Sequence, residues 1–148
     1  PNHFLVIPRR AGQIPSQVAM ASPSIMQQQV DLIFAFAGEG VHSAKTDLSV
    51  VRGSATFGRC AAAITAEGLD IEDVLQRGLG THEAPWSVVA TTIINVCLGD
   101  VWKDWGYAPD FACGHSVGEL AAAYMCGMCS LEQTLQTALT LGRIAPKV

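Results

Sequence analysis

The sequence predicts an α/β fold, in which short strands and longer helices pack into one domain. Three observations lead to this prediction. Residues 31–36 are apolar after Asp31 and have the length of a buried strand, and residues 84–104 are a mainly apolar segment with the length of a long helix. The pattern Gly114-His115-Ser116-Val117-Gly118 separates a second short strand from a further apolar helix.

An extended arm, residues 1–30, precedes the first predicted strand. The arm holds four of the seven prolines of the chain. Because proline fixes φ and has no N–H group, this composition argues against a helix or a central strand. The apolar side chains of the arm still need to be buried. We predict that they contact mainly other protein chains.

Three helices are predicted between residues 54 and 104. A helix over residues 54–67 is followed by a shorter helix that Asp70 opens, with Asp73 at its third position. Pro85 lies in the first turn of the helix predicted over residues 84–104, a position that suits proline.

The last predicted helix begins after a capping box. Ser130 and Gln133 have the spacing at which each side chain bonds the backbone N–H of the other. We expect Gly142 and Pro146 to close this helix, because both residues are typical of helix C-termini.

Ser116 is predicted to lie on a sharp turn from a strand over residues 110–113 into a helix over residues 117–128. Glycine on either side of the serine, at Gly114 and Gly118, allows the backbone of the strand and the backbone of the helix to approach each other closely. A serine in this place lies at a helix N-terminus, where the helix dipole and free N–H groups stabilise an oxyanion. The pattern is therefore typical of a nucleophilic serine.

Several stretches of the chain resemble the malonyl-CoA:acyl-carrier-protein acyltransferase family, which includes the acyltransferase domains of polyketide and fatty acid synthases. They include the serine turn at residues 114–118, called the elbow below, with the helix after it. They also include the Trp-Gly-x-x-Pro-Asp stretch before the elbow, and the first strand with the loop after it. The similar stretches are residues 32–40, 57–75, 105–110, 114–124, 127 and 130–132.

The resemblance implies an incomplete hydrolase-like core over residues 31–148, with a short parallel sheet flanked by helices. These residues would be the N-terminal half of an acyltransferase domain. In the family, such a domain moves an acyl group from coenzyme A, through a serine ester, to the thiol of an acyl carrier protein. The coenzyme A thioester is the substrate, and no cofactor is implied.

The resemblance also implies roles for individual residues. Ser116 would be the nucleophile, and the backbone N–H groups of Val117 and Glu39 would form the oxyanion hole. The family usually has glutamine where Glu39 stands. A backbone donor survives that change, but a carboxylate beside an oxyanion is unfavourable.

Two further departures concern the substrate and the base. The arginine that holds the malonyl carboxylate in the family falls at Leu141. Arg143, two positions on, is the other candidate for substrate binding, although on a helix it points about 200° away.

The histidine that activates the serine in the family lies well beyond the serine in sequence. The histidines of this chain all precede Ser116, and they are His3, His42, His82 and His115. The side chain of His115 is expected to diverge from its neighbour Ser116, which makes it a poor base. A serine hydroxyl without a positioned base is a weak nucleophile.

Composition excludes some function classes. A net charge of −4 argues against nucleic acid as a partner, and no apolar run reaches the ~20 residues that a membrane-spanning helix needs. Charged residues make up only 15% of the chain, against ~25% in ordinary soluble domains. Either part of the surface is covered by something else, or the chain has an alanine-rich core of tightly packed helices.

The five cysteines favour a reducing compartment. Cys126 and Cys129 have redox or zinc spacing, but they lack a second pair and a nearby histidine, so we interpret them as core residues and expect no metal. A chain that begins at Pro1 is compatible with the removal of a targeting peptide, as in a plastid.

Three hypotheses for function follow. The favoured one is a structural, accessory subunit of a larger assembly that contacts its partners through the arm and an open sheet edge. The second is a fragment of an active acyltransferase whose other half supplies the histidine and which acts on an acyl carrier protein. The third is a small serine hydrolase with an unrecognised base.

Overall fold

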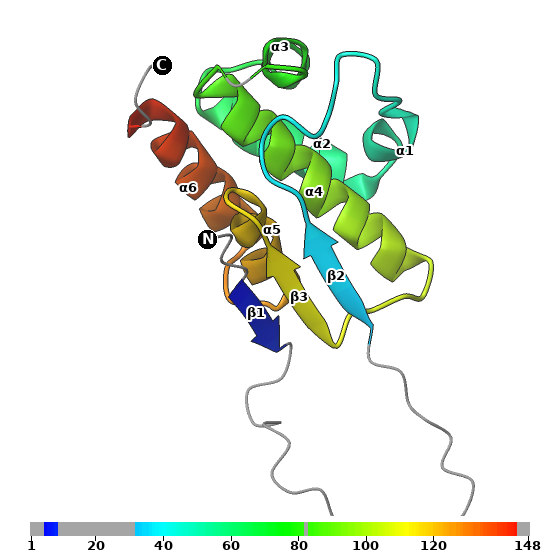
Figure 1. The fold of residues 1–148 in the computed structure, drawn as a ribbon. Helices are drawn as coiled ribbons and strands as arrows, with labels where there is room; N and C mark the ends of the chain where they lie inside the picture. The colour runs from blue at the N-terminus through cyan, green and yellow to red at the C-terminus, as the bar shows by residue number, and fades with distance from the viewer. Residues whose placement is uncertain (1–4, 9–31, 82, 145–148) are drawn as a thin grey trace, which may run out of the picture.

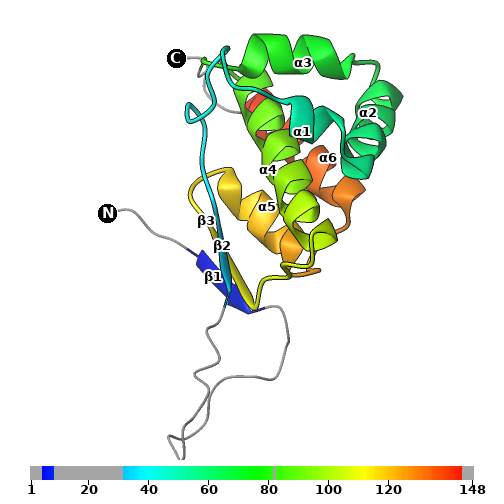
Figure 2. The same ribbon diagram turned by 90° about the vertical axis from the view of Figure 1, so that its right-hand side faces the viewer.

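The computed structural model describes residues 5–8, 32–81 and 83–144. Within these ranges the chain forms a small sheet and a layer of helices. Figure 2 shows the sheet nearly edge-on, with the helices all on one side of it. The α/β prediction is confirmed, and one face of the sheet carries no helix of the described chain.

The sheet has the strand order β1-β3-β2 (Figure 1). The strands are β1 (Leu5–Pro8), β2 (Ile33–Phe36) and β3 (Phe111–Gly114). β2 and β3 are parallel, with Ile33 opposite Phe111 and Phe36 opposite Gly114, which confirms the expected parallel pair. β1 runs antiparallel to β3.

The position of β1 changes the prediction for the arm. Residues 5–8 pair with β3 of the same chain, so this part of the arm extends the chain's own sheet. It does so as an edge strand, where Pro8 at the strand end is tolerated. The rest of the arm, and with it most of the side chains predicted to contact other chains, lies outside the described residues.

Helix α4 is the centre of the helical layer, and it contacts each of the other helices. Fourteen of its 19 residues are buried, which explains why its sequence is apolar on every side. The helices are α1 (Ser49–Arg52), α2 (Ala55–Ala66), α3 (Ile71–Gly78), α4 (Trp86–Asp104), α5 (Gly118–Met125) and α6 (Leu131–Ile144).

The predicted caps are present. The side chain of Asp70 accepts a hydrogen bond of 2.9 Å from the backbone N–H of Asp73. Ser54, for which no cap was predicted, caps α2 in the same way. Ser130 and Gln133 bond each other's backbone N–H groups at 3.2 and 2.9 Å. The capping box was therefore predicted correctly from its spacing.

Two helix ends were predicted wrongly. α5 ends at Met125, three residues before the expected Met128, because the chain turns at Gly127 with φ 73°. α6 does not stop at Gly142 but continues to Ile144. A Cβ at Gly142 would lie 2.5 Å from Cβ of Pro85, so this glycine permits close helix packing and is not a terminator. Pro146 lies outside the described residues.

A buried carboxylate links three helices through hydrogen bonds. Asp100 of α4 is 8% exposed and accepts hydrogen bonds from Thr56 of α2 (2.7 Å), Tyr124 of α5 (2.6 Å) and the ammonium of Lys103 (2.9 Å). Burial by itself would raise the pKa of Asp100, but these hydrogen bonds and the charge of Lys103 outweigh it and lower the pKa below its usual value. The network holds α5, and the turn before it, against α4.

The five cysteines are free thiols. Cys60 and Cys97 are fully buried, and their mutual hydrogen bond together with burial raises the pKa of Cys60. Within the described ranges, no helix is long and apolar enough to cross a membrane, and no group of side chains is arranged to hold a metal ion.

Candidate functional site

Ser116 lies at the turn between β3 and α5, as predicted. Its φ is +53°, and it is the only non-glycine residue of the described chain with positive φ. Such a conformation costs on the order of 1–3 kcal/mol in a non-glycine residue and persists only where the surrounding structure enforces it. The serine is exposed and directly precedes Val117, the N-cap residue of α5.

The two glycines of the elbow are required by close backbone contacts. A Cβ at Gly114 would lie 2.2 Å from the backbone carbon of Gly118. A Cβ at Gly118 would lie 2.4 Å from the carbonyl oxygen of Phe36. Backbone atoms cannot give way as a flexible side chain can, so the turn that presents Ser116 depends on both residues.

The loop after β2 reaches the elbow at Gly38. A Cβ at Gly38 would lie 3.0 Å from Nδ1 of His115 and 3.3 Å from Cβ of Ser116. The backbone N–H of His115 donates to the carbonyl of Phe36 at 3.0 Å, which joins the ends of the two strands. The structure therefore brings the two sequence motifs, residues 38–40 and 114–118, together.

Glu39 follows Gly38 in this loop, and its carboxylate has a fixed partner. Oε1 of Glu39 accepts a hydrogen bond of 2.6 Å from the hydroxyl of Ser87, which is fully buried in the first turn of α4. Ser87 was not singled out in the sequence, because no motif marks it. The carboxylate is thus directed toward the N-terminus of α4, where negative charge is favourable.

The backbone N–H groups of Val117 and Glu39 lie on the two segments that meet at Ser116. Within the described residues, no hydrogen bond of turns, loops or caps uses either group as a donor. Both therefore remain candidates for binding an oxyanion beside Ser116.

The two candidate substrate-binding residues lie on α6. Leu141 is 38% exposed. Arg143 lies 3.5 Å from a carboxylate oxygen of Glu67, the C-cap residue of α2, so its guanidinium is paired with this carboxylate. That either position binds the substrate stays a prediction.

Of the histidines, His3 and His82 lie outside the described residues. His42 lies in the loop after β2, and His115 neighbours Ser116. That no histidine of this chain serves Ser116 as its base stays a prediction.

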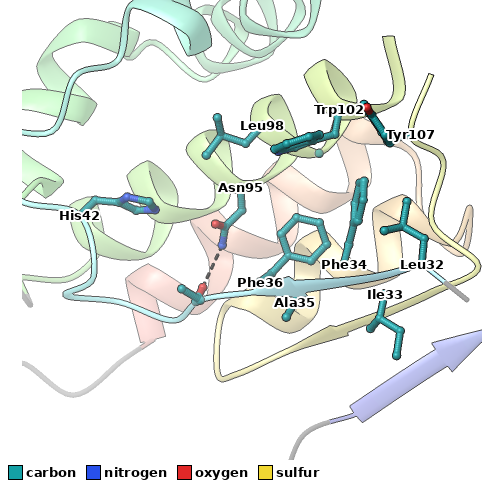
Figure 3. Close-up of a pocket in the computed structure, with 12 residues that line it drawn as sticks. Leu32, Ile33, Phe34, Ala35, Phe36, His42, Asn95, Leu98, Trp102 and Tyr107 are labelled. Carbon is teal, nitrogen blue, oxygen red and sulfur yellow. Dashed lines mark hydrogen bonds between the residues drawn. The ribbon is translucent and has the colours of Figure 1, made fainter. Parts of the chain in front are cut away.

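An apolar groove with a volume of about 570 Å³ runs between β2 and α4 (Figure 3). Phe34 and Phe36 point from β2 toward α4, where Leu98 and Trp102 face them. Among the described residues that line the groove, none is an acid, a lysine or an arginine. No sequence pattern marks this groove, because it arises where two segments that are far apart in the chain meet.

Polar groups occur at one end of the groove. The amide of Asn95 donates a hydrogen bond of 2.9 Å to the carbonyl of Ala37. Nε2 of His42 is buried and has no hydrogen-bond partner among the described residues. Burial lowers the pKa of His42, and a hydrogen bond with Asn95 opposes this only in part. The imidazole is therefore neutral near pH 7.

Comparison with known proteins supports an acyltransferase relationship. Residues 36–148 match the acyl transferase domain family. The chain is 35% identical over 118 residues to the non-reducing polyketide synthase ntnG of Nectria, with 67% of the chain and 5% of that protein covered. It is 29% identical over 143 residues to the reducing polyketide synthase PKS2 of Cochliobolus heterostrophus, with 88% of the chain and 7% of that protein covered.

A solved structure has the same fold. The malonyl-CoA:ACP transacylase of Synechocystis superposes with a TM-score of 0.63 at 21% identity, over 77% of this chain and 39% of the transacylase. The chain thus spans less than a tenth of the two polyketide synthases named above and well under half of the transacylase. The family match covers most of the chain and includes the strained serine turn, and we conclude that the chain belongs to the acyl transferase domain family.

Proposed function

We propose that this chain carries the serine nucleophile of a malonyl-CoA:acyl-carrier-protein type acyltransferase of polyketide or fatty acid synthesis. The observation that carries the proposal is the φ of +53° at Ser116, held by close backbone contacts at Gly114 and Gly118. A positive φ in a serine lowers the stability of the fold. Such strain is typical of functional sites, and here it projects the side chain of a nucleophile from a strand-to-helix turn.

In the proposed reaction, the hydroxyl of Ser116 attacks the carbonyl carbon of an acyl-CoA thioester. A base takes the hydroxyl proton, and the N–H groups of Val117 and Glu39 bind the oxyanion that forms. When the C–S bond breaks, coenzyme A leaves as the thiol and the acyl group remains as a serine ester. The thiol of an acyl carrier protein then takes the acyl group and releases the serine.

The chain by itself supplies no histidine after Ser116, so we expect the base to come from another polypeptide segment. In this proposal, residues 1–148 contribute the nucleophile to the site, and the base is contributed from outside them. A small serine hydrolase with its own base is the less favoured hypothesis for the same reason.

A structural, accessory role is the second candidate. Glu39 in place of glutamine, Leu141 in place of arginine and the low charge of the chain all support it. The arm supports it less than the sequence suggested, because residues 5–8 pair with the chain's own sheet.

Chemical rescue distinguishes the candidates. The chain is incubated with malonyl-CoA or acetyl-CoA, with and without added imidazole, and its intact mass is measured. We expect one acyl adduct per chain only when imidazole is present, and none in Ser116→Ala. An adduct without imidazole would show that the chain has its own base. The absence of any adduct with imidazole would refute the proposal and favour the accessory role.

A further inference from the structure

We propose that Asn95 is a positioning residue for acyl transfer, because its amide fixes the loop after β2, residues 37–42, which contains the backbone N–H of Glu39. The reaction itself rests on the proposed function, whereas the role of Asn95 rests on hydrogen bonds and close contacts of the described residues. Asn95 acts through the loop and need not touch the substrate. No motif marks it in the sequence, and the reaction described above makes no use of it.

The amide of Asn95 lies in the core of the fold. Asn95 is 4% exposed in the interior of α4, and its neighbours Ile94 and Val96 are buried as well. A buried amide lowers the stability of a fold unless its N–H and C=O groups are hydrogen-bonded. Here hydrogen bonds join the side chain of Asn95 to both ends of the loop after β2.

Both ends of this loop are held in place. At the first end, Nδ2 of Asn95 donates a hydrogen bond of 2.9 Å to the carbonyl of Ala37 (Figure 3). At the other end, Asn95 forms a hydrogen bond with the imidazole of His42. The backbone N–H of Gly80, which follows α3, donates to the carbonyl of His42 at 2.8 Å. The loop is therefore anchored on both sides of its middle residues.

The loop needs this support because of Gly38. A Cβ at Gly38 would lie 3.0 Å from the carbonyl oxygen of His115 and 3.3 Å from Cβ of Ser116, so a residue without a side chain suits this close approach to the elbow. Glycine, however, has the greatest backbone freedom of all residues. Without other restraints, rotation at Gly38 would turn the next peptide, with the N–H of Glu39, away from the elbow.

The hydrogen bond to Ala37 removes part of this freedom. A peptide is planar, so a bond to the carbonyl of Ala37 fixes the direction of the whole peptide that joins Ala37 to Gly38. The preceding carbonyl, that of Phe36, accepts from the N–H of His115 at 3.0 Å. Two consecutive peptides before Gly38 are thus held, the first by the elbow and the second by α4.

Helix α4 also holds the loop beyond Gly38. The hydroxyl of Ser87, about two turns before Asn95 in α4, donates to the carboxylate of Glu39 at 2.6 Å. The peptide between Gly38 and Glu39 is therefore restrained on both sides by side chains of one buried helix. The N–H of this peptide is the candidate oxyanion donor, so its direction depends on Asn95 and Ser87 together.

The first test measures mobility and needs no reaction. The native chain is compared with Asn95→Leu, which has a similar size and no N–H donor. The control is Thr92→Val, which removes a fully buried hydroxyl that bonds within α4. We expect the NMR order parameter of the Glu39 N–H to be about 0.85 in the native chain and in Thr92→Val, and to fall below about 0.6 in Asn95→Leu. An unchanged order parameter in Asn95→Leu would overturn the inference.

The second test measures the step that the loop serves. Acylation of Ser116 is followed at several concentrations of acetyl-CoA in the presence of imidazole. We expect Asn95→Leu to lower the saturating rate by about 10- to 100-fold and to leave the half-saturating concentration unchanged, because a displaced donor weakens binding of the oxyanion and not of the thioester. Thr92→Val is expected to leave both values unchanged. If Asn95→Leu does not fold, Asn95→Asp replaces it in both tests, because an ionised carboxylate has a similar shape and no N–H donor.

The two tests separate this inference from the proposed function. Equal saturating rates in the native chain and in Asn95→Leu, or a change in the half-saturating concentration alone, would overturn the positioning role. If the native chain is not acylated at all, the proposed function fails, and the order parameter of Glu39 decides by itself whether Asn95 fixes the loop.

Discussion

The hydroxyl of Ser87 donates a hydrogen bond of 2.6 Å to the carboxylate of Glu39. The backbone N–H of Glu39 is a candidate oxyanion donor. The loop after β2 thereby presents its backbone near Ser116, while its charged side chain is bonded to the first turn of α4. This arrangement explains how the carboxylate of Glu39 is accommodated beside the candidate oxyanion site.

The Glu39–Ser87 pair predicts that substitutions of its two residues change the rate of Ser116 acylation in opposite directions. Glu39→Gln removes a charge from the neighbourhood of the oxyanion, and one such charge is worth about 1–2 kcal/mol, or roughly 5- to 30-fold in rate. We expect the imidazole-dependent acylation rate to rise by an amount in this range.

A double-mutant cycle is the control for that prediction. Ser87→Ala frees the carboxylate, so it should lower the acylation rate in the native background but leave the rate unchanged in Glu39→Gln. Equal effects of Ser87→Ala in both backgrounds would mean that Ser87 acts only through packing.

Acyl preference is predicted to depend on Leu141. A leucine offers no partner for the malonyl carboxylate. In the presence of imidazole, we therefore expect the chain to react with acetyl-CoA at least as fast as with malonyl-CoA. Leu141→Arg is expected to shift the ratio of the two rates toward malonyl-CoA by about tenfold, the effect of roughly one charge-assisted hydrogen bond. The matched control is Ile144→Arg, at a 71% exposed residue of the same helix. An equal shift in both variants would contradict the assignment.

The elbow glycines are predicted to be essential for stability. Gly114→Ala or Gly118→Ala would force a methyl group to within 2.4 Å of backbone atoms. We expect a loss of about 2–4 kcal/mol in the free energy of unfolding, measured with urea. Gly58→Ala is the control, because a Cβ there meets no atom within 4 Å and alanine favours a helix by about 0.5–1 kcal/mol. Equal stability of all three variants would contradict the close backbone contacts at the elbow.

The network around Asp100 predicts a loss of stability in acid. The pKa of Asp100 is lowered in the folded chain, so the unfolded state binds the proton more readily. Its contribution is therefore fully present above the unfolded pKa, about 4, and is lost as the pH falls through the lower folded pKa. Urea unfolding between pH 6 and pH 2.5 should show this loss, and Asp100→Asn should show a flatter dependence below pH 4.

Removing a donor from the same network tests its geometry. Tyr124→Phe deletes a 2.6 Å hydrogen bond to the buried carboxylate and is expected to cost about 1.5–3 kcal/mol in the free energy of unfolding. Tyr107→Phe, in a 54% exposed ring, is expected to change it by less than about 0.5 kcal/mol.

The sequence by itself determined the local elements. Capping residues such as Asp70 and Ser130 act within one helical turn, and the spacing of Gly114, Ser116 and Gly118 is a local requirement of a strand-to-helix turn. These features depend on neighbours in the chain, so a pattern predicts them. The parallel pairing of β2 and β3 was expected from the resemblance and is present.

Only the tertiary structure decided the contacts between distant segments. Gly142 looked like a helix terminator, but it lies against Pro85 inside a continuing helix. The pairing of β1 with β3, the bond from Ser87 to Glu39 and the groove beside β2 each join segments separated by many residues. Such contacts are fixed by packing and by the pairing of buried polar groups across the fold, and local sequence patterns carry no record of them.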